Sequence, residues 1–457
     1  MNRWIRTATA ILVTLGPNLS QRANFASPPL REVEVECEEE VATCKPPDNG
    51  AGPLWCYGAP LLVRDGDRVF ASVMETGEGV PPLSNTRWRL YQRDASGWRQ
   101  VRQEESYRER EPCPIVRPSP GRLVLSENPS TEPPGTQYGR CSPRLLSFET
   151  ASDTARPTII TPQWSGSPRF TDHSYRGLAA DPTRHELLAL NIDAVSSLQH
   201  WALLGESGTT LRQGTIEFPI RACYPQVAMR DRAAHVLAVG DIVEPIETWR
   251  AYKKERTGAA WDYVFRRLFY TWTPDGTREP FHAPIEVATV DATAGHITNL
   301  DLWIGADGAA RLLYLETSST PLIRDRFFPG TPITTRLQYA EIARGQIRRR
   351  VTLIAGGEGQ PEHPHHGRFH ATPDGILHVV AVVSGADRAG RNLLENRLIS
   401  LSATGEPVST VSIPLKEPFT LPFTACERGG SAPSDWLDLF GQTQRGAALR
   451  YARVRLR

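Results

Sequence analysis

A repeated pair of strands is the feature that most restricts how this chain can fold. Each copy holds a short strand, a tight turn rich in Gly or Asp, and an apolar strand. Self-similarity of this kind indicates a repeat architecture. The copies are GAPLLVRDGDRVFASV from Gly58, CPIVRPSPGRLVLSE from Cys113, YRGLAADPTRHELLALN from Tyr175, YPQVAMRDRAAHVLAVGD from Tyr224, TNLDLWIGADGAARLLYLE from Thr298, HGRFHATPDGILHVVAVVSG from His366 and, more weakly, CERGGSAPSDWLDLFGQ from Cys426.

A second hairpin separates successive copies. Its versions are RLYQRDASGWRQV, RLLSFETASDTARPTII, WALLGESGTTLRQGTI, LFYTWTPDGTREPF, LQYAEIARGQIRRRVTLI and RLISLSATGEPVSTVSI. Each reads as two strands of alternating polarity joined by a turn such as Ala-Ser-Gly or Pro-Asp-Gly. Every unit therefore has four strands, here named A to D in chain order. We predict an all-β fold, a β-propeller of seven blades or six.

The two ends of the chain support a closed ring. After the seventh A–B pair, one strand remains at the C-terminus, AALRYARVRLR, and its missing partner is REVEVEC, starting at Arg31. An N-terminal strand that completes the last blade would remove an exposed sheet edge. The alternative, two β-sandwich domains, leaves the recurring units unexplained. We therefore expect residues 27–457 to form one domain.

The N-terminus resembles a secretory signal. Arg3 and Arg6 precede a short apolar stretch, Ala8–Leu15, and small residues follow near Ala26. This pattern predicts a signal peptide over residues 1–26, and hence a secreted or periplasmic protein. The apolar stretch is too short to span a bilayer. With Lys+Arg 52 against Asp+Glu 51, the net charge of +1 gives no basis for nucleic-acid binding.

Seven cysteines occur in the chain, and an exported protein can form disulfides. We consider three pairings from the expected topology, and Cys223 would then be left over. The pairings are Cys37–Cys44, Cys56–Cys426 and Cys113–Cys141. Because the sequence has no C-x-x-C pair, a thiolate zinc site or a thioredoxin-like motif is not expected.

Loop lengths indicate which face carries function. The expected A–B and C–D turns are minimal, whereas four B–C loops are long and polar: 75–87, 127–141, 241–262 and 316–331. In a propeller, the B–C loops share one face with the starts of the A strands. Long polar loops on a rigid scaffold are where binding sites are usually built. The side chains that open the A strands should therefore surround a central funnel.

The A–B units are similar to those of the sialidase superfamily in its broad sense, the BNR-repeat-like propellers. YRGLAADPTRHELLALN and HGRFHATPDGILHVVAVVSG carry this resemblance, while the Asp-box motif survives only as WTPDGT from Trp272. The resemblance implies activity on carbohydrates. A sialidase would imply an arginine triad, a Tyr/Glu nucleophile pair and an acidic proton donor. The similar propeller lyases would imply His and Tyr for proton transfer and Arg for the uronate.

Two segments carry the densest candidate chemistry. In TDHSYRG (171–177), a His/Tyr pair could move protons while Arg stabilises negative charge. Alternatively, Tyr175 could be a nucleophile activated by Glu427 or Asp301, or these side chains could simply fill the central tunnel. In HPHHGRFH (363–370), a metal site is conceivable, but no matching carboxylate follows from the spacing.

We therefore predict a carbohydrate-active propeller, a hydrolase or lyase of an anionic glycan; the alternative is a non-catalytic propeller that binds glycan or protein. The expected catalytic residues are His173, Tyr175 and His366, and the expected substrate-binding residues are Arg176, Arg221, Tyr224, Asp301, Arg368 and Glu427. We expect no metal, no cofactor and no nucleic acid, and a monomer that does not span the membrane. The basic, aromatic loop 246–268 is either a lid over the glycan or a solvated insertion.

Overall fold

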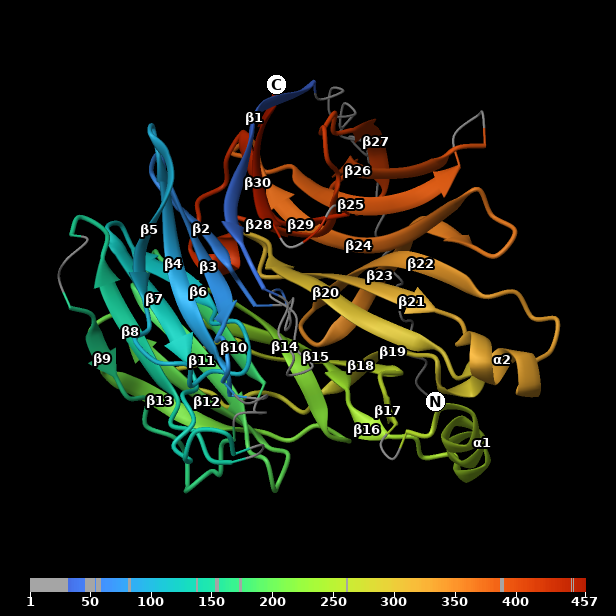
Figure 1. Cartoon of the computed structure of the whole chain (residues 1–457), viewed down its shortest axis with the longest axis horizontal. Helices are drawn as coiled ribbons and strands as arrows, with labels where there is room; N and C mark the ends of the chain where they lie inside the picture. Colours follow the sequence, from blue (N-terminus) through green and yellow to red (C-terminus); the bar gives the residue numbers. More distant parts are fainter. Residues whose placement is uncertain are drawn as a thin grey trace, which may run out of the picture.

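The protein is a seven-bladed β-propeller, as the repeats predict. The computed structural model describes residues 32–45, 54, 59–80, 84–136, 139–152, 156–171, 175–259, 262–386, 390–444, 446 and 448–457. Seven four-stranded antiparallel sheets follow one another around a ring (Figure 1). The expected signal peptide, residues 1–26, lies outside the described residues.

Each of the first six blades is one continuous four-stranded meander of the chain. The innermost strand is always the A strand, and the outermost is the D strand. In chain order the blades are β2–β5 (Leu62–Asp65, Arg68–Thr76, Thr86–Asp94, Gly97–Gln103), β6–β9 (Ile115–Ser119, Arg122–Glu127, Arg144–Glu149, Thr158–Ile160), β10–β13 (Arg176–Asp181, Glu186–Ile192, Gln199–Gly205, Thr210–Ile216), β14, β15, β18 and β19 (Ala222–Arg230, Ala233–Gly240, Arg267–Thr273, Ile285–Thr289), β20–β23 (His296–Ile304, Ala310–Thr317, Thr334–Ala343, Gln346–Gly357), and β24–β27 (Glu362–Ala371, Leu377–Ala386, Asn392–Leu401, Pro407–Ser412).

The seventh blade joins the two ends of the chain. Its strands run β28 (Phe419–Thr424), β29 (Trp436–Thr443), β30 (Ala448–Leu456) and then β1 (Val33–Thr43). In Figure 1, β1 lies in blue beside β30 in red, and Val33 pairs with Leu456 while Thr43 pairs with Ala448. The prediction of an N-terminal strand that completes the last blade is confirmed.

Two strands differ from the sequence prediction. We expected the seventh A strand at Cys426, but it is β28, which ends two residues earlier. The chain then forms the 3-10 helix η2 (Glu427–Gly429) instead of a tight Gly/Asp turn, so this pair lacked the repeated pattern. In the fourth blade, the D strand is β19 and not the segment that ends at Phe281, because residues 274–284 form a longer connection.

The B–C loops of two neighbouring blades each contain a helix. Helix α1 (Glu247–Thr257) lies in the fourth blade between the paired short strands β16 (Ile242–Val243) and β17 (Tyr263–Val264), and α2 (Pro321–Phe327) lies in the fifth. They pack side by side through Trp249, Ile323 and Phe327 (Figure 1). The loop 246–268 is therefore anchored by its aromatic side chains.

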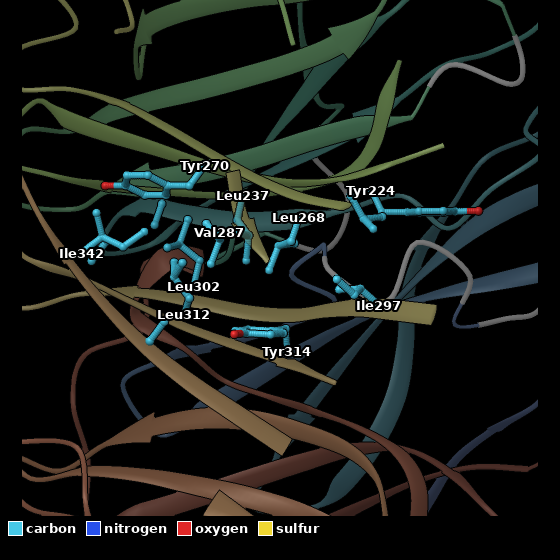
Figure 2. Close-up of a cluster of buried hydrophobic side chains, with 14 of the residues drawn as sticks. Tyr224, Leu237, Leu268, Tyr270, Val287, Ile297, Leu302, Leu312, Tyr314 and Ile342 are labelled. Atoms are coloured by element: carbon cyan, nitrogen blue, oxygen red, sulfur yellow. The ribbon is translucent and has the colours of Figure 1, made fainter. Parts of the chain in front are cut away.

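The hydrophobic core lies between blades. Figure 2 shows the largest cluster, in which Leu237 and Tyr270 of the fourth blade meet Leu302 and Tyr314 of the fifth. Apolar side chains from both faces of neighbouring sheets are buried together, and this burial is the main favourable term that holds a ring of sheets together. The result is a rigid support for the loops on each end of the axis.

The thiols of Cys37, Cys44 and Cys113 are free, so the expected Cys37–Cys44 and Cys113–Cys141 disulfides are wrong. Cys426 also has a free thiol, so its expected pairing with Cys56, which lies outside the described residues, is wrong as well. Among the described residues, no helix is both long and apolar enough to cross a membrane.

Candidate functional site

A pair of buried tyrosines, 4% and 8% exposed, lies at the start of two neighbouring A strands. Tyr175 directly precedes β10, and Tyr224 lies in β14 of the next blade. The Tyr224 hydroxyl donates a hydrogen bond to the Tyr175 hydroxyl at 3.3 Å, and the ring centroids are 4.4 Å apart. In Figure 2, the Tyr224 hydroxyl points away from the other labelled side chains. The two phenol groups thus form one unit at the end of the axis that the B–C loops cover.

The backbone of Tyr224 is strained. Its φ is +50°, a conformation that bulky residues rarely adopt, and it lies in a bulge between Cys223 and Gln226. The side-chain amide of Asn299 donates to the Tyr224 carbonyl at 2.6 Å, which holds the bulge from the fifth blade. Strain of this kind persists only where the surroundings impose it, and it is concentrated at functional sites.

Arg221 supplies positive charge beside the pair. Its guanidinium lies 5.7 Å from the ring centroid of Tyr175 and 5.9 Å from that of Tyr263. An ion pair with Asp241 fixes one side of the group. Since 26% of the Arg221 side chain stays exposed, it can still meet a ligand in solvent.

Helix α1 adds more positive charge on the same face. Its base is fixed by a buried ion pair between Arg266 and Glu244, 2.5 Å apart, and by the Arg266 guanidinium over the ring of Trp249. Its exposed basic side chains are Arg250, Lys254 and Arg256. Tyr263, which follows the helix, is 47% exposed and stands next to Arg221.

The other residues expected around Tyr175 are placed differently. His173 lies outside the described residues, so its role stays a prediction. Arg176 is buried and points inward: its Nη2 is 3.0 Å from Glu109 Oε2 and donates to the carbonyl of Glu111 at 2.9 Å. A guanidinium held by these contacts supports the start of β10.

His366 and Arg368 are buried in β24. Burial, together with the neighbouring Arg368, holds the pKa of His366 well below its usual range, so the ring is neutral at pH 7. The Arg368 guanidinium donates to the carbonyls of Pro422 and Leu300 and lies 4.6 Å from the ring centroid of Phe423. These contacts join the fifth, sixth and seventh blades.

Asp301 and Glu427 lie toward the other end of the axis, where the A strands finish. The short helix η2 packs against the inner strands of four blades there, and its Arg428 forms a buried ion pair with Asp301 at 2.9 Å. Glu427 accepts a hydrogen bond from the Trp303 indole, and burial raises the pKa of its carboxyl. Because β28 precedes Glu427, the expected place of this residue at the funnel entrance is wrong.

Sequence reasoning missed several residues of this region. The sequence places Asn299 at the start of an A strand but does not reveal its buried hydrogen bond to Tyr224, and no motif identifies Glu109. His296, at the start of β20, packs edge-on against Phe265 with the ring centroids 5.6 Å apart, and the Phe265 ring centroid lies 5.9 Å from that of Tyr224. Burial and the nearby Arg266 lower the pKa of His296.

The comparisons with known proteins place the chain by fold. No protein-family model matches the sequence. No curated protein matches it either. The crystal structure of polysaccharide lyase Uly1 aligns with a TM-score of 0.52 at 10% identity, over 87% of this chain and 89% of that chain. An ulvan lyase of family PL25 aligns at 0.45 and 7% identity, over 91% and 94%. A puromycin-hydrolyzing peptidase of Mycobacterium tuberculosis aligns at 0.46 and 11%, over 88% of this chain and 53% of that one.

Proposed function

We propose that this protein is a lyase that cleaves a uronate-containing polysaccharide by β-elimination. The observation that carries the proposal is the hydrogen-bonded pair of Tyr175 and Tyr224 beside Arg221. A β-elimination needs a base, an acid and a positive charge next to the substrate carboxylate. These three side chains offer that set in one place.

The reaction can be written on these groups alone. The ionised oxygen of Tyr175 takes the proton from the carbon next to the uronate carboxylate. The electron pair of that C–H bond forms the new C=C bond, and the glycosidic C–O bond breaks. The leaving oxygen takes the hydroxyl proton of Tyr224. A proton transfer along the 3.3 Å hydrogen bond from Tyr175 to Tyr224 then restores the starting state.

Arg221 supports this reaction through charge. Its guanidinium stands near Tyr175, where negative charge sits before proton abstraction, and it can pair with the uronate, which becomes more electron-rich as the proton leaves. The exposed Arg250, Lys254 and Arg256 of α1 extend the positive surface for further anionic sugars.

Hydrolysis is the less supported route. A glycosidase with a tyrosine nucleophile needs a carboxylate to activate it. Asp241 is bound by Arg221, and Glu109 by Arg176. The sialidase resemblance also requires three arginines around the substrate carboxylate. Arg368 instead contacts backbone carbonyls, and Arg428 forms an ion pair with Asp301, so neither supports such a triad.

The fold is consistent with the proposal, since the Uly1 structure is that of a polysaccharide lyase. In this proposal the protein is exported, with residues 1–26 as the signal, and acts as a monomeric single domain, residues 27–457, without a cofactor. Its partner is the polysaccharide.

The test is incubation of the mature chain with a panel of uronate- and sialate-containing polysaccharides. We expect ultraviolet absorbance from unsaturated ends, and its loss in the Tyr224→Phe variant. Reducing ends without that absorbance would indicate a hydrolase. Binding without turnover on every polymer would contradict an enzyme and support a glycan-binding propeller.

A further inference from the structure

Three buried carboxyl groups meet between the first and second blades. Glu104 follows β5, Glu109 pairs with Thr86 in an isolated bridge, and Glu127 ends β7. One oxygen of each lies within 4.8 Å of the others, and the residues are 9%, 1% and 0% exposed. This cluster lies on the face of the long B–C loops but below the surface.

Two of the three carboxylates have partners. Glu127 accepts from the Trp88 indole at 2.7 Å and pairs with Arg144, while Glu109 pairs with Arg176. Glu104 Oε2, by contrast, is buried without a hydrogen-bond partner, and so is Glu109 Oε1. A buried carboxylate oxygen without a donor is costly unless a cation or a proton satisfies it.

Charge points the same way. The two guanidinium groups leave the third carboxylate of the cluster uncompensated. Positive charge is therefore what this cluster favours.

The spacing suits a hard cation of the size of calcium. Ca²⁺ binds oxygen ligands at about 2.3–2.6 Å, so two ligands on opposite sides of it lie about 4.6–5.2 Å apart and neighbouring ligands lie closer. The oxygens of the cluster fall within these limits. Mg²⁺ forms bonds of about 2.0–2.1 Å in a strict octahedral geometry and usually keeps several bound waters. A buried cluster of carboxylates therefore suits Mg²⁺ less well than Ca²⁺.

We propose that Glu104, Glu109 and Glu127 bind one calcium-type divalent cation. The cation would fix Glu109 and, through it, Arg176, which follows Tyr175 directly. The site would thereby hold the start of β10 against the first two blades. This inference stands on its own contacts and does not require the lyase activity.

The full chain, treated with EGTA, would be titrated with Tb³⁺ and then with Ca²⁺. Because the Trp88 indole is hydrogen-bonded to Glu127, we expect tryptophan-sensitised luminescence from bound Tb³⁺. Ca²⁺ should displace the Tb³⁺ and remove this luminescence. Elemental analysis of the untreated protein should find one Ca²⁺ per chain, and adding Ca²⁺ to the EGTA-treated protein should raise its Tm by a few degrees. Luminescence that Ca²⁺ does not displace, or displacement by Mg²⁺ as effective as by Ca²⁺, would contradict a calcium-type site.

Glu104→Gln should abolish the luminescence and the Ca²⁺-dependent rise in Tm. Its matched control is the exposed neighbour Glu105→Gln, which should keep both. In EGTA, Glu104→Gln should melt at the same temperature as the wild type or higher, because it removes the uncompensated charge. If neither Ca²⁺ nor Mg²⁺ changes the wild-type Tm and no metal co-purifies, a proton and not a cation satisfies the cluster, and the proposal fails.

Discussion

The hydroxyls of Tyr175 and Tyr224 lie 3.3 Å apart, although the two residues belong to different blades. Tyr224 is held there in a left-handed backbone conformation by a hydrogen bond from Asn299 of a third blade. Three consecutive blades therefore place one pair of hydrogen-bonded phenol groups beside Arg221. The lyase proposal depends on this arrangement, and the following predictions test its parts.

Removal of the Tyr224 hydroxyl should strongly lower the turnover number and leave folding unchanged. In Tyr224→Phe, we expect the turnover number to fall about 10²–10⁴-fold, the range usual for a lost acid or base, with a nearly unchanged Tm. Initial rates of double-bond formation would measure the loss. Tyr252→Phe, in α1, changes a tyrosine that packs on Phe327 and should keep its activity. Equal rates for the Tyr224 variant and the wild type would show that the pair is structural.

Arg221 should matter for binding the anionic polymer. Arg221→Ala should raise KM, lower kcat/KM by about 10-fold or more, and reduce the dependence of KM on salt. Arg278→Ala removes an equally charged group in the C–D turn of the fourth blade, on the opposite face, and should change none of these three quantities. Similar effects of both variants would mean that only net charge matters.

The bond from Asn299 should position Tyr224. Loss of a buried hydrogen bond costs about 1–3 kcal/mol, so Asn299→Ala should be less stable and also have a lower kcat. Asn396→Ala removes comparable buried bonds, to Phe419 in the seventh blade, and should lose stability without the same loss of kcat. If folded Asn299→Ala has the kcat of the wild type, the strained bulge at Tyr224 is not needed for catalysis.

Buried histidines should make the propeller sensitive to acid. Burial lowers the pKa of His235 to about 3, and its Nδ1 is hydrogen-bonded to the Tyr270 hydroxyl at 2.6 Å. The unfolded chain takes up this proton below its ordinary pKa of about 6.5 and the folded chain does not, so stability is lost as pH falls from about 6.5 toward 3.

The double variant His235→Phe/Tyr270→Phe removes the titrating ring together with its hydroxyl partner. Between pH 7 and pH 5, its free energy of unfolding should fall by about 2 kcal/mol less than that of the wild type, at about 1.4 kcal/mol per pH unit below the ordinary pKa. Urea unfolding at both pH values measures the difference. His185→Gln changes a half-exposed histidine and should behave as the wild type does. Identical losses in the wild type and the double variant would exclude His235 as the source.

The fold was predictable because strand pairs with tight turns repeat along the sequence. The position of the seventh A strand could not be predicted, because the helix η2 replaces the tight turn after it and the repeated pattern is missing there. That difference moved Glu427 from the expected funnel to the opposite end of the axis.

The candidate site was predictable only as a set of strand starts. Tyr175, Arg221 and Tyr224 were identified by position, but their mutual contacts depend on the twist between blades. Arg176 follows Tyr175 and therefore points to the other face of the strand, where Glu109 binds it. The buried hydrogen bond from Asn299 to Tyr224 and the carboxyl cluster were missed because long-range buried contacts leave no local pattern in the sequence.

The mass of the products of a purified uronate oligosaccharide tests the central claim most directly. β-Elimination adds no water, so the masses of the two fragments should sum to the mass of the substrate. One fragment should carry a double bond at its non-reducing end. Tyr224→Phe should leave the oligosaccharide intact. Fragments whose summed mass exceeds the substrate by one water would show hydrolysis and would contradict the lyase mechanism.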